Sequence, residues 1–244
     1  MTTLSRIVIN PARRGGAKLL TNTHAMHAAV RSSFPNDIDL DAGRVLWRVD
    51  PGEHEHVLYI VGPEKPTGAH IVEQAGWDTR PAQSTDYERF LAQLTRGQRW
   101  RFELVANPTY SAANGGGRGK VKAHVSVRHQ IGWLYKRAAE AGFALAPRPE
   151  DEVPDEERAR WSPLENVGIT ERWTDTFFKN PDRRGRPVRI AKARFVGTLE
   201  VTDAERLRKT LANGIGRARG YGCGLMTLAP VSYTHLRAHE TKAN

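Results

Sequence analysis

Three residues that can carry protons or positive charge, His24, His27 and Arg31, lie three and four positions apart in one predicted helix. Residues at this spacing share one face of an α-helix. Imidazole suits general acid–base chemistry because its unperturbed pKa of about 6.5 lets it exchange protons near neutrality. Neighbouring positive charge lowers that pKa, and a bound phosphodiester raises it. The same spacing also fits ordinary surface histidines, so chemistry at this face is a hypothesis.

A glycine- and arginine-rich run over residues 214–224 has the composition of an anion-binding loop. Glycine lets the backbone approach a bulky anion with its N–H groups turned inward, and arginine stays charged at any working pH. The spacing fits neither a nucleotide loop ending in Gly-Lys-Ser/Thr nor a dinucleotide site, so we expect a polymeric phosphate. The candidate contacts are Gly214, Gly216, Arg217, Arg219, Gly220 and Gly222.

Two more segments concentrate positive charge. One is a predicted hairpin with Lys179, Arg183, Arg184, Arg186 and Arg189, and the other is a flexible loop with Lys120 and Lys122. Phosphate contacts from such cations would make affinity fall with salt. The alternatives are a charged hairpin that prevents aggregation and, for the second segment, a simple linker.

Composition limits the class of partner and the kind of site. The 244 residues carry a formal net charge of +10 and a pI near 10.0, which favours a polyanionic partner over a merely solvated basic surface. Cys223 is the single cysteine, so an intrachain disulfide and a cysteine-based zinc site are excluded, and we expect a small residue filling a tight turn in a cytoplasmic protein. His54 and His56 lack a convincing third ligand. We therefore expect no metal, no cofactor and no membrane segment.

Hydrophobic periodicity arranges these candidates in two successive β-α-β-β-α-β patterns. The first has strands at 4–10, 45–49, 56–61 and, weakly, 74–79, with a helix over 24–33 that Asn22 or Thr23 caps. The second has strands at 99–104, 166–171, 174–178, 189–201 and 225–229, with helices over 125–141 and 202–214. The sequence predicts an α+β protein of two tandem ferredoxin-like domains, residues 1–93 with the histidine helix and 94–231 with the basic hairpin and glycine loop. Residues 232–244 are interpreted as a non-native or disordered tail.

Five segments in order, at 7–11, 22–27, 46–48, 101–108 and 214–225, resemble the CasE-type CRISPR RNA endonucleases. The likeness extends over about residues 1–231. It implies tandem ferredoxin-like domains and cleavage of the repeat stem-loop in a CRISPR precursor transcript. It also implies that the protein stays on the mature RNA as a subunit of the type I-E Cascade complex, with the repeat RNA hairpin and the other Cascade subunits as partners.

The resemblance assigns roles to the helix residues. In that family a Tyr-x-x-His pattern supplies the catalytic histidine, which His27 matches, whereas His24 stands at the tyrosine position. Arg31 is the nearest candidate for a cation further along the helix, without an identity match. The implied chemistry is metal-independent attack of an RNA 2′-hydroxyl on the adjacent phosphorus, giving a 2′,3′-cyclic phosphate or 3′-phosphate and a 5′-hydroxyl. The basic hairpin is the expected groove reader.

Two other functions remain open on sequence grounds. The first is a non-catalytic RNA-hairpin-binding subunit of a ribonucleoprotein complex, in which His27 is incidental. A more remote one is a basic DNA-binding or structural protein. Stacking of unpaired bases is not expected, because Trp47, Trp100 and Trp133 all occur in core-like patterns and leave few rings free.

Overall fold

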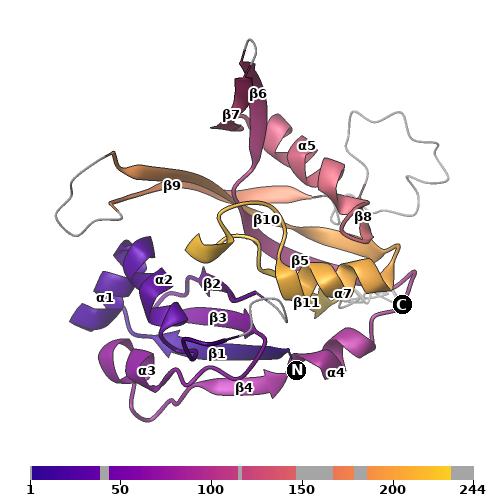
Figure 1. The fold of residues 1–244 in the computed structure, drawn as a ribbon. Coiled ribbons are helices and arrows are strands. Elements are labelled where there is room, and N and C mark those ends of the chain that lie inside the picture. The colour runs from indigo at the N-terminus through magenta and orange to yellow at the C-terminus, as the bar shows by residue number, and fades with distance from the viewer. Residues whose placement is uncertain (1, 39–43, 115–116, 147–166, 179–185, 232–244) are drawn as a thin grey trace, which may run out of the picture.

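The computed structural model describes residues 2–38, 44–114, 117–146, 167–178 and 186–231. They form two antiparallel sheets flanked by helices, with a separate two-stranded hairpin projecting from the C-terminal half (Figure 1). The fold class is thus a mixed α and β architecture built on antiparallel sheets.

The first sheet contains four strands in the order β2-β3-β1-β4. Its strands are β1 (Thr3–Ile9), β2 (Leu46–Asp50), β3 (His56–Gly62) and β4 (Gln83–Asp86). The helices of this half are α1 (Arg14–Thr21), α2 (Thr23–Arg31), α3 (Ala69–Ala75) and α4 (Tyr87–Ala92). The first and third strands therefore lie side by side at the centre, and the last strand along the chain occupies the edge next to the first.

Helix α2 is oriented by its cap and by its apolar residues. The side chain of Asn22 accepts hydrogen bonds from the backbone N–H groups of His24 and Ala25, as expected for a helix N-cap. Met26 and Val30 are buried one turn apart in a cluster with residues of β1 and β3. Because residues four apart share a face, this packing holds the helix on its sheet and leaves His24 and His27 only partly buried.

The second sheet follows the order β11-β5-β10-β8, and β9 pairs with β10 outside that path. Its strands are β5 (Arg99–Ala106), β8 (Phe143–Leu145), β9 (Gly168–Phe177), β10 (Val188–Val201) and β11 (Met226–Pro230). The helices are α5 (Val127–Ala138) and α7 (Ala204–Asn213), and the projecting hairpin is β6 (Thr109–Asn114) with β7 (Gly117–Ala123).

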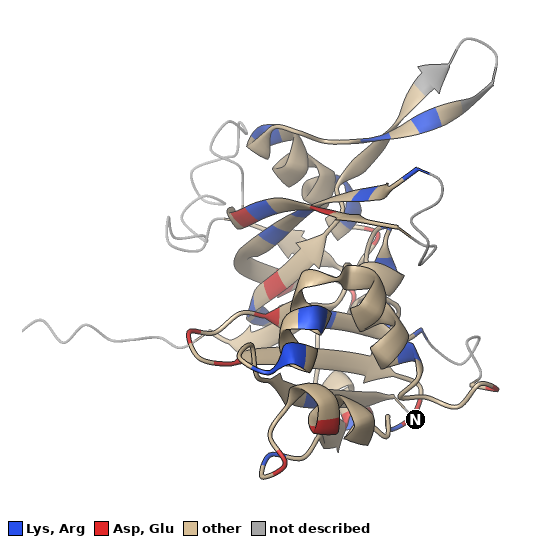
Figure 2. Cartoon of the chain, turned by 90° about the vertical axis from the view of Figure 1, so that its left-hand side faces the viewer, with Lys and Arg blue, Asp and Glu red and all other residues tan. Residues whose placement is uncertain are grey.

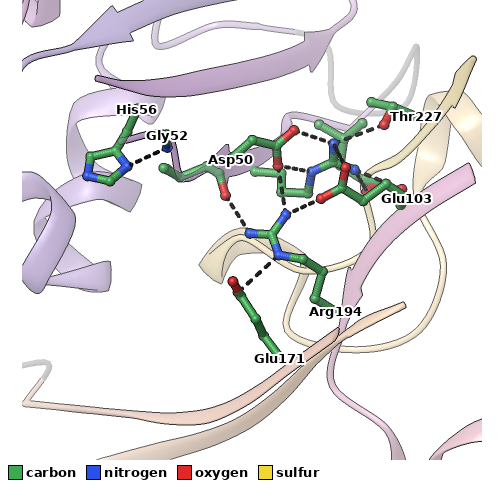
Figure 3. Close-up of polar contacts among 10 residues, drawn as sticks. Asp50, Gly52, His56, Glu103, Glu171, Arg194 and Thr227 are labelled. Atoms are coloured by element: carbon green, nitrogen blue, oxygen red, sulfur yellow. Dashed lines mark hydrogen bonds and ion pairs between the residues drawn. The ribbon is translucent and has the colours of Figure 1, made fainter. Parts of the chain in front are cut away.

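The two sheets share one core and one polar network. Leu46 and Val61 of the first sheet are buried in the same apolar cluster as Phe102 and Leu104 of the second. Beside it, a buried guanidinium of β10, Arg194, reaches carboxylates from both sheets (Figure 3). The halves are thereby fixed against each other, which matters because the candidate site contains residues from both.

Several local expectations were wrong. Residues 74–79 form no strand: α3 ends at Ala75 and the edge strand is Gln83–Asp86, whose polar sequence gives no hydrophobic signal. Residues 166–171 and 174–178 are not two strands, because Gly168–Phe177 is one continuous strand.

The segment after β1 forms helix α1, although the sequence analysis assigned no element to it. An added Cβ on Gly15 would lie 2.1 Å from the carbonyl oxygen of Gln74, and one on Gly16 would lie 1.9 Å from that of Asn10. Close packing therefore explains why a segment of poor helix propensity is helical.

Candidate active site

His27 of α2 faces the glycine-rich loop, although almost two hundred residues separate them. Its ring centroid lies 5.3 Å from that of Tyr221, with the two planes tilted by 47°. A Cβ on Gly220 would lie 3.3 Å from Cε1 of His27 and 3.5 Å from its Nδ1. Glycine at position 220 thus lets the loop backbone approach the imidazole. Two segments that the sequence marked as functional are brought into contact.

The pKa of His27 lies below its ordinary value of 6.5. Partial burial is the main cause, because it disfavours the charged imidazolium. A hydrogen bond to the backbone of Gly220 acts in the opposite direction, and the positive charges of His24 and Arg31 lower the pKa further. The balance favours the neutral imidazole near pH 7.

His24 and Arg31 flank His27 but differ in their surroundings. The ring of His24 stacks on Phe177 of β9, with centroids 5.8 Å apart and planes 4° from parallel, and its buried Nδ1 has no hydrogen-bond partner among the described residues. Arg31 donates from Nη1 to the carbonyl oxygen of Pro35 at 3.3 Å. The three predicted residues therefore share the helix face, and His27 alone has its ring against the loop residues Gly220 and Tyr221.

The loop owes its shape to glycines and to anchoring by buried side chains. The 3₁₀ turn η2 (Arg219–Tyr221) is followed by Gly222, whose φ of 75° favours glycine and where a Cβ would lie 2.7 Å from Cζ3 of Trp47. Trp47 donates from Nε1 to the carbonyl oxygen of Gly220 at 3.0 Å. The indole of β2 therefore fixes the loop segment that touches His27. Trp47 was interpreted from sequence as a core residue only.

A buried lysine forms a second anchor that the sequence analysis missed. Lys192 of β10 is 5% exposed, and its Nζ lies 2.7 Å from Oδ2 of Asp175 and 2.6 Å from the carbonyl oxygen of Tyr221. Thr23, the first residue of α2, donates to the same Asp175 oxygen at 2.5 Å. Lys192 thus connects the glycine loop, strand β9 and the start of the histidine helix. The only sequence signal for it is a charged residue at a buried position of an apolar strand.

The other side of the glycine loop borders a polar cavity of about 800 Å³. Gly214, Gly216, Arg217 and Arg219 line it together with residues of the β6–β7 hairpin and of α5. Arg137 of α5, which also lines it, lies over the ring of Trp133 with its Cζ 4.3 Å from the ring centroid. One part of the loop thus lines this arginine-rich cavity and the next part, Gly220 and Tyr221, contacts His27. Arg137 is a cation that sequence reasoning did not single out.

The remaining predicted cations occupy two places. Lys120 and Lys122 are exposed on β7, which is a strand rather than the flexible loop expected. Arg186 and Arg189 are exposed at the start of β10, whereas Lys179, Arg183 and Arg184 lie outside the described residues. Figure 2 shows lysine and arginine along the C-terminal half, including the projecting hairpin.

Other chemistry considered for the chain receives little support. Cys223 is fully buried, and burial raises the pKa of its thiol to about 12, which fits a packing residue better than a nucleophile. Among the residues with described positions, no three His, Cys, Asp or Glu side chains gather as metal ligands would. No helix in the described part of the chain has the length and apolar character to cross a bilayer.

Comparison with known proteins places the chain among CRISPR proteins. Residues 3–230 match the family model described as CRISPR associated protein. The CRISPR-associated endoribonuclease Cse3 of Thermus thermophilus is 30% identical over 234 residues, covering 93% of this chain and 99% of the relative. The Cascade subunit CasE of Escherichia coli is 25% identical over 201 residues, covering 76% and 89%.

Solved structures agree with this assignment. Thermus thermophilus Cse3 bound to an RNA representing a pre-cleavage complex superposes with a TM-score of 0.70 at 27% identity, covering 94% of this chain and 99% of that one. Cas6e of Escherichia coli shares the fold, with a TM-score of 0.58 at 22% identity over 95% of this chain and 100% of that one. The chain therefore belongs to the CRISPR-associated protein family that its residues 3–230 match.

Proposed function

We propose that this protein is a metal-independent endoribonuclease that cuts CRISPR precursor RNA at the repeat stem-loop and remains on the mature RNA within Cascade. One observation carries the proposal: the imidazole of His27 lies against Gly220 and Tyr221 of a loop whose preceding residues, up to Arg219, line an arginine-rich cavity. A proton-transfer group and a phosphate-binding surface are therefore adjacent. The relative Cse3 is named an endoribonuclease, and its solved structures hold RNA.

His27 acts as the general base in this proposal. Its lowered pKa keeps the ring neutral near pH 7, so it can accept the proton of the 2′-hydroxyl just upstream of the cut. The 2′-oxygen then attacks the adjacent phosphorus, and the bond from phosphorus to the 5′-oxygen breaks. The leaving oxygen takes a proton from a second donor or from water. The products are a 2′,3′-cyclic phosphate and a 5′-hydroxyl.

Charge that grows on the phosphorane needs donors close to His27. Arg31 and His24 lie near enough to affect the pKa of His27, so we assign to Arg31 the stabilisation of that charge and to His24 a contact that supports the site. The ring of His24 stacks on Phe177 and its Nδ1 is enclosed, so we assign any contact of His24 with RNA to Nε2. His24 is therefore the weaker of the two in this assignment.

The RNA stem is assigned to the basic surface on the C-terminal half. Arg217, Arg219 and Arg137 line the cavity, and Lys120 and Lys122 place further positive charge on the neighbouring hairpin, for RNA outside the stem. Phosphate contacts of this kind suit an A-form stem, whose deep major groove hides its bases. The segment from Lys179 to Arg189 remains a candidate groove reader, and its described arginines, Arg186 and Arg189, are exposed.

We propose that the chain forms two ferredoxin-like domains, residues 1–93 and 94–231, of which the first supplies His27 and the second supplies the RNA-binding surface. The strand orders β2-β3-β1-β4 and β11-β5-β10-β8 each match a β-α-β-β-α-β unit when the four strands of each path are numbered along the chain, with β6, β7 and β9 left out as additions to the second unit. The histidine helix then belongs to the first domain and the glycine loop to the second, so the site lies between them. We place the protein in the cytoplasm, where its precursor RNA is made.

The decisive experiment compares RNA cleavage in chelator by the wild type, His27→Ala and His54→Ala. His54 is an exposed histidine in the turn between β2 and β3 and serves as the matched control. We expect His27→Ala to slow cleavage of a repeat hairpin by about 10²–10⁴-fold with RNA affinity retained. A substrate with 2′-deoxyribose at the cut should resist every variant. Equal cleavage by wild type and His27→Ala would remove His27 from the mechanism.

A non-catalytic RNA-binding subunit is the rival function, since His24 stands at the position of the family tyrosine. This rival function predicts that the wild type, His27→Ala and His54→Ala all bind the repeat RNA hairpin tightly and leave the RNA uncut. Detection of a 2′,3′-cyclic phosphate on the wild-type product excludes it.

A further inference from the structure

Large apolar side chains are exposed on the hairpin and at the start of α5 within the described residues: Tyr110, Val121, Val125 and Val127. Tyr110, which is 44% exposed, and Val121 lie on opposite faces of the hairpin, because Tyr110 pairs with Lys122 and Val121 pairs with Ser111. The hairpin face that bears Tyr110 is therefore a patch with one large exposed ring.

Three rings form a row within this patch. The ring centroids of Tyr110 and His124 are 4.8 Å apart with planes tilted by 32°, and those of His124 and His129 are 5.8 Å apart with planes at 20°. Burial is the main cause that lowers the pKa of His124, and the charges of His129, Lys136 and Arg137 lower it further. A neutral imidazole near pH 7 completes an aromatic row rather than adding another cation.

The row is held in place before any ligand binds. The backbone N–H of His124 donates to the carbonyl oxygen of Pro108 at 2.9 Å, and the buried side chain of Gln130 donates to the His124 carbonyl at 2.9 Å. His129 Nδ1 and Ser126 Oγ are 2.7 Å apart. Fixed rings lose little freedom on binding, so their contact area contributes more fully to affinity.

Positive charge lies on the same side of the hairpin. Tyr110 pairs with Lys122 and Ala112 pairs with Lys120, and paired or alternate residues of a hairpin share one face. Aromatic rings interleaved with lysines are the surface that single-stranded nucleic acids use, with bases stacked on rings and phosphates on cations. Charge complementarity thus favours RNA over an apolar protein partner.

We propose that Tyr110, His124 and His129 form a stacking platform for an unpaired nucleobase of the bound RNA, separate from the site of cleavage. This inference rests on the proposed function only in taking RNA as the ligand. It revises the expectation that few rings are free to stack, because Tyr110 was hidden in a segment whose strand character the sequence did not reveal. The phosphates on either side of that base lie on Lys120 and Lys122.

The test uses two uncleavable probes of matched length: an oligoadenylate with one central 2-aminopurine, and a blunt RNA duplex with all bases paired. Tyr110→Leu should bind the single strand about 5- to 100-fold more weakly and lose the 2-aminopurine quenching seen with wild type. Tyr110→Phe keeps the ring and should match wild type. Duplex affinity should be the same for all three proteins.

Salt dependence separates the platform from its lysines. Tyr110→Leu should keep the wild-type slope of log affinity against log salt, whereas Lys122→Gln should reduce it by about 0.7 for each lost single-strand phosphate contact. His129→Leu removes the far ring and provides a second variant if Tyr110→Leu alters folding. Tyr110→Leu and His129→Leu should melt at the wild-type temperature, because the side chains of Tyr110 and His129 are exposed.

Two results would overturn the proposal. One is unchanged single-strand affinity and quenching in Tyr110→Leu, which would leave the patch as a contact for a protein. The other is an equal loss of affinity for the duplex, which would make the ring a groove contact. His27→Ala should retain the quenching, so a failure of the platform is distinguishable from a failure of the proposed catalysis.

Discussion

The ammonium of Lys192 lies 2.7 Å from Oδ2 of Asp175, and the pair connects the histidine helix with the glycine loop. Lys192 also donates to the carbonyl oxygen of Tyr221, and Asp175 accepts from Thr23 at the start of α2. Each element that forms the candidate site thus has one direct contact with this pair. The position of His27 relative to Tyr221 is therefore coupled to a buried ion pair.

Replacing Lys192 should therefore impair stability and cleavage together. Lys192→Met leaves the Asp175 carboxylate without its buried partner, and breaking a buried ion pair costs about 3–5 kcal/mol. Urea unfolding would measure the loss. The double variant Lys192→Met with Asp175→Asn should recover part of it, because no unpaired charge is left. A loss below about 1 kcal/mol would mean that the pair behaves as an exposed one.

Gly220 should matter for catalysis rather than for binding. In Gly220→Ala the new methyl group would lie 3.3 Å from Cε1 of His27, so the imidazole must shift by a few tenths of an ångström. Because a displacement of 1 Å can cost about 100-fold, we expect the maximal cleavage rate to fall roughly tenfold with little change in RNA affinity. Single-turnover kinetics would separate the two.

Gly168→Ala is the matched control for that variant. No atom of the described residues lies within 4 Å of a Cβ at this position, so the substitution tests glycine replacement alone. If both variants slow cleavage equally, the close approach between Gly220 and His27 is not the cause.

The sequence was sufficient to predict the helix with His27, because a capping residue and two apolar residues one turn apart are local signals. The glycine loop was also predictable from composition. Their contact was not, since it depends on how two separately folded sheets pack. Trp47 illustrates the limit: its apolar ring predicts a core position, whereas its Nε1 donates to Gly220 in the other half of the chain.

Segments whose signal is weak or polar were predicted poorly for a physical reason. The edge strand Gln83–Asp86 contains only polar residues, and β7 begins with Gly-Arg-Gly-Lys, so neither shows apolar alternation. Pairing with a neighbouring strand determines their structure. The contact between the rings of Tyr110 and His124 likewise depends on the pairing of β6 with β7, which the sequence does not indicate.

Cleavage should depend on pH through the ionisation of His27. Since the neutral imidazole accepts the proton, kcat/KM should be constant around neutrality and fall about tenfold per unit once the pH drops below the His27 pKa, which lies under 6.5. Arg31→Gln removes a positive charge that lowers this pKa, so the acid limb should move to higher pH. Arg96→Gln, at an exposed loop position, should leave it in place. If the acid limb of the Arg31→Gln profile lies at the same pH as in the wild type, Arg31 does not act on the ionisation of His27.

Arg194 should control how firmly the two halves hold together. Its guanidinium is 8% exposed and contacts Asp50 of β2, Glu103 of β5 and Glu171 of β9 (Figure 3). Arg194→Met leaves carboxylates of both sheets short of a partner, so we expect unfolding in urea to lose about 3–5 kcal/mol. Glu171→Gln removes a carboxylate that is 48% exposed and should cost less than about 1 kcal/mol.

Arg194→Met also tests whether the two halves of the protein unfold as one unit. In the wild type a shared core and this network should give coincident transitions by fluorescence and circular dichroism. If Arg194 carries much of the coupling, Arg194→Met should separate the two transitions and lower cleavage, because His27 and the glycine loop belong to different sheets. Coincident transitions in the variant would assign the coupling to the apolar contacts of Leu46 and Val61 with Phe102 and Leu104 instead.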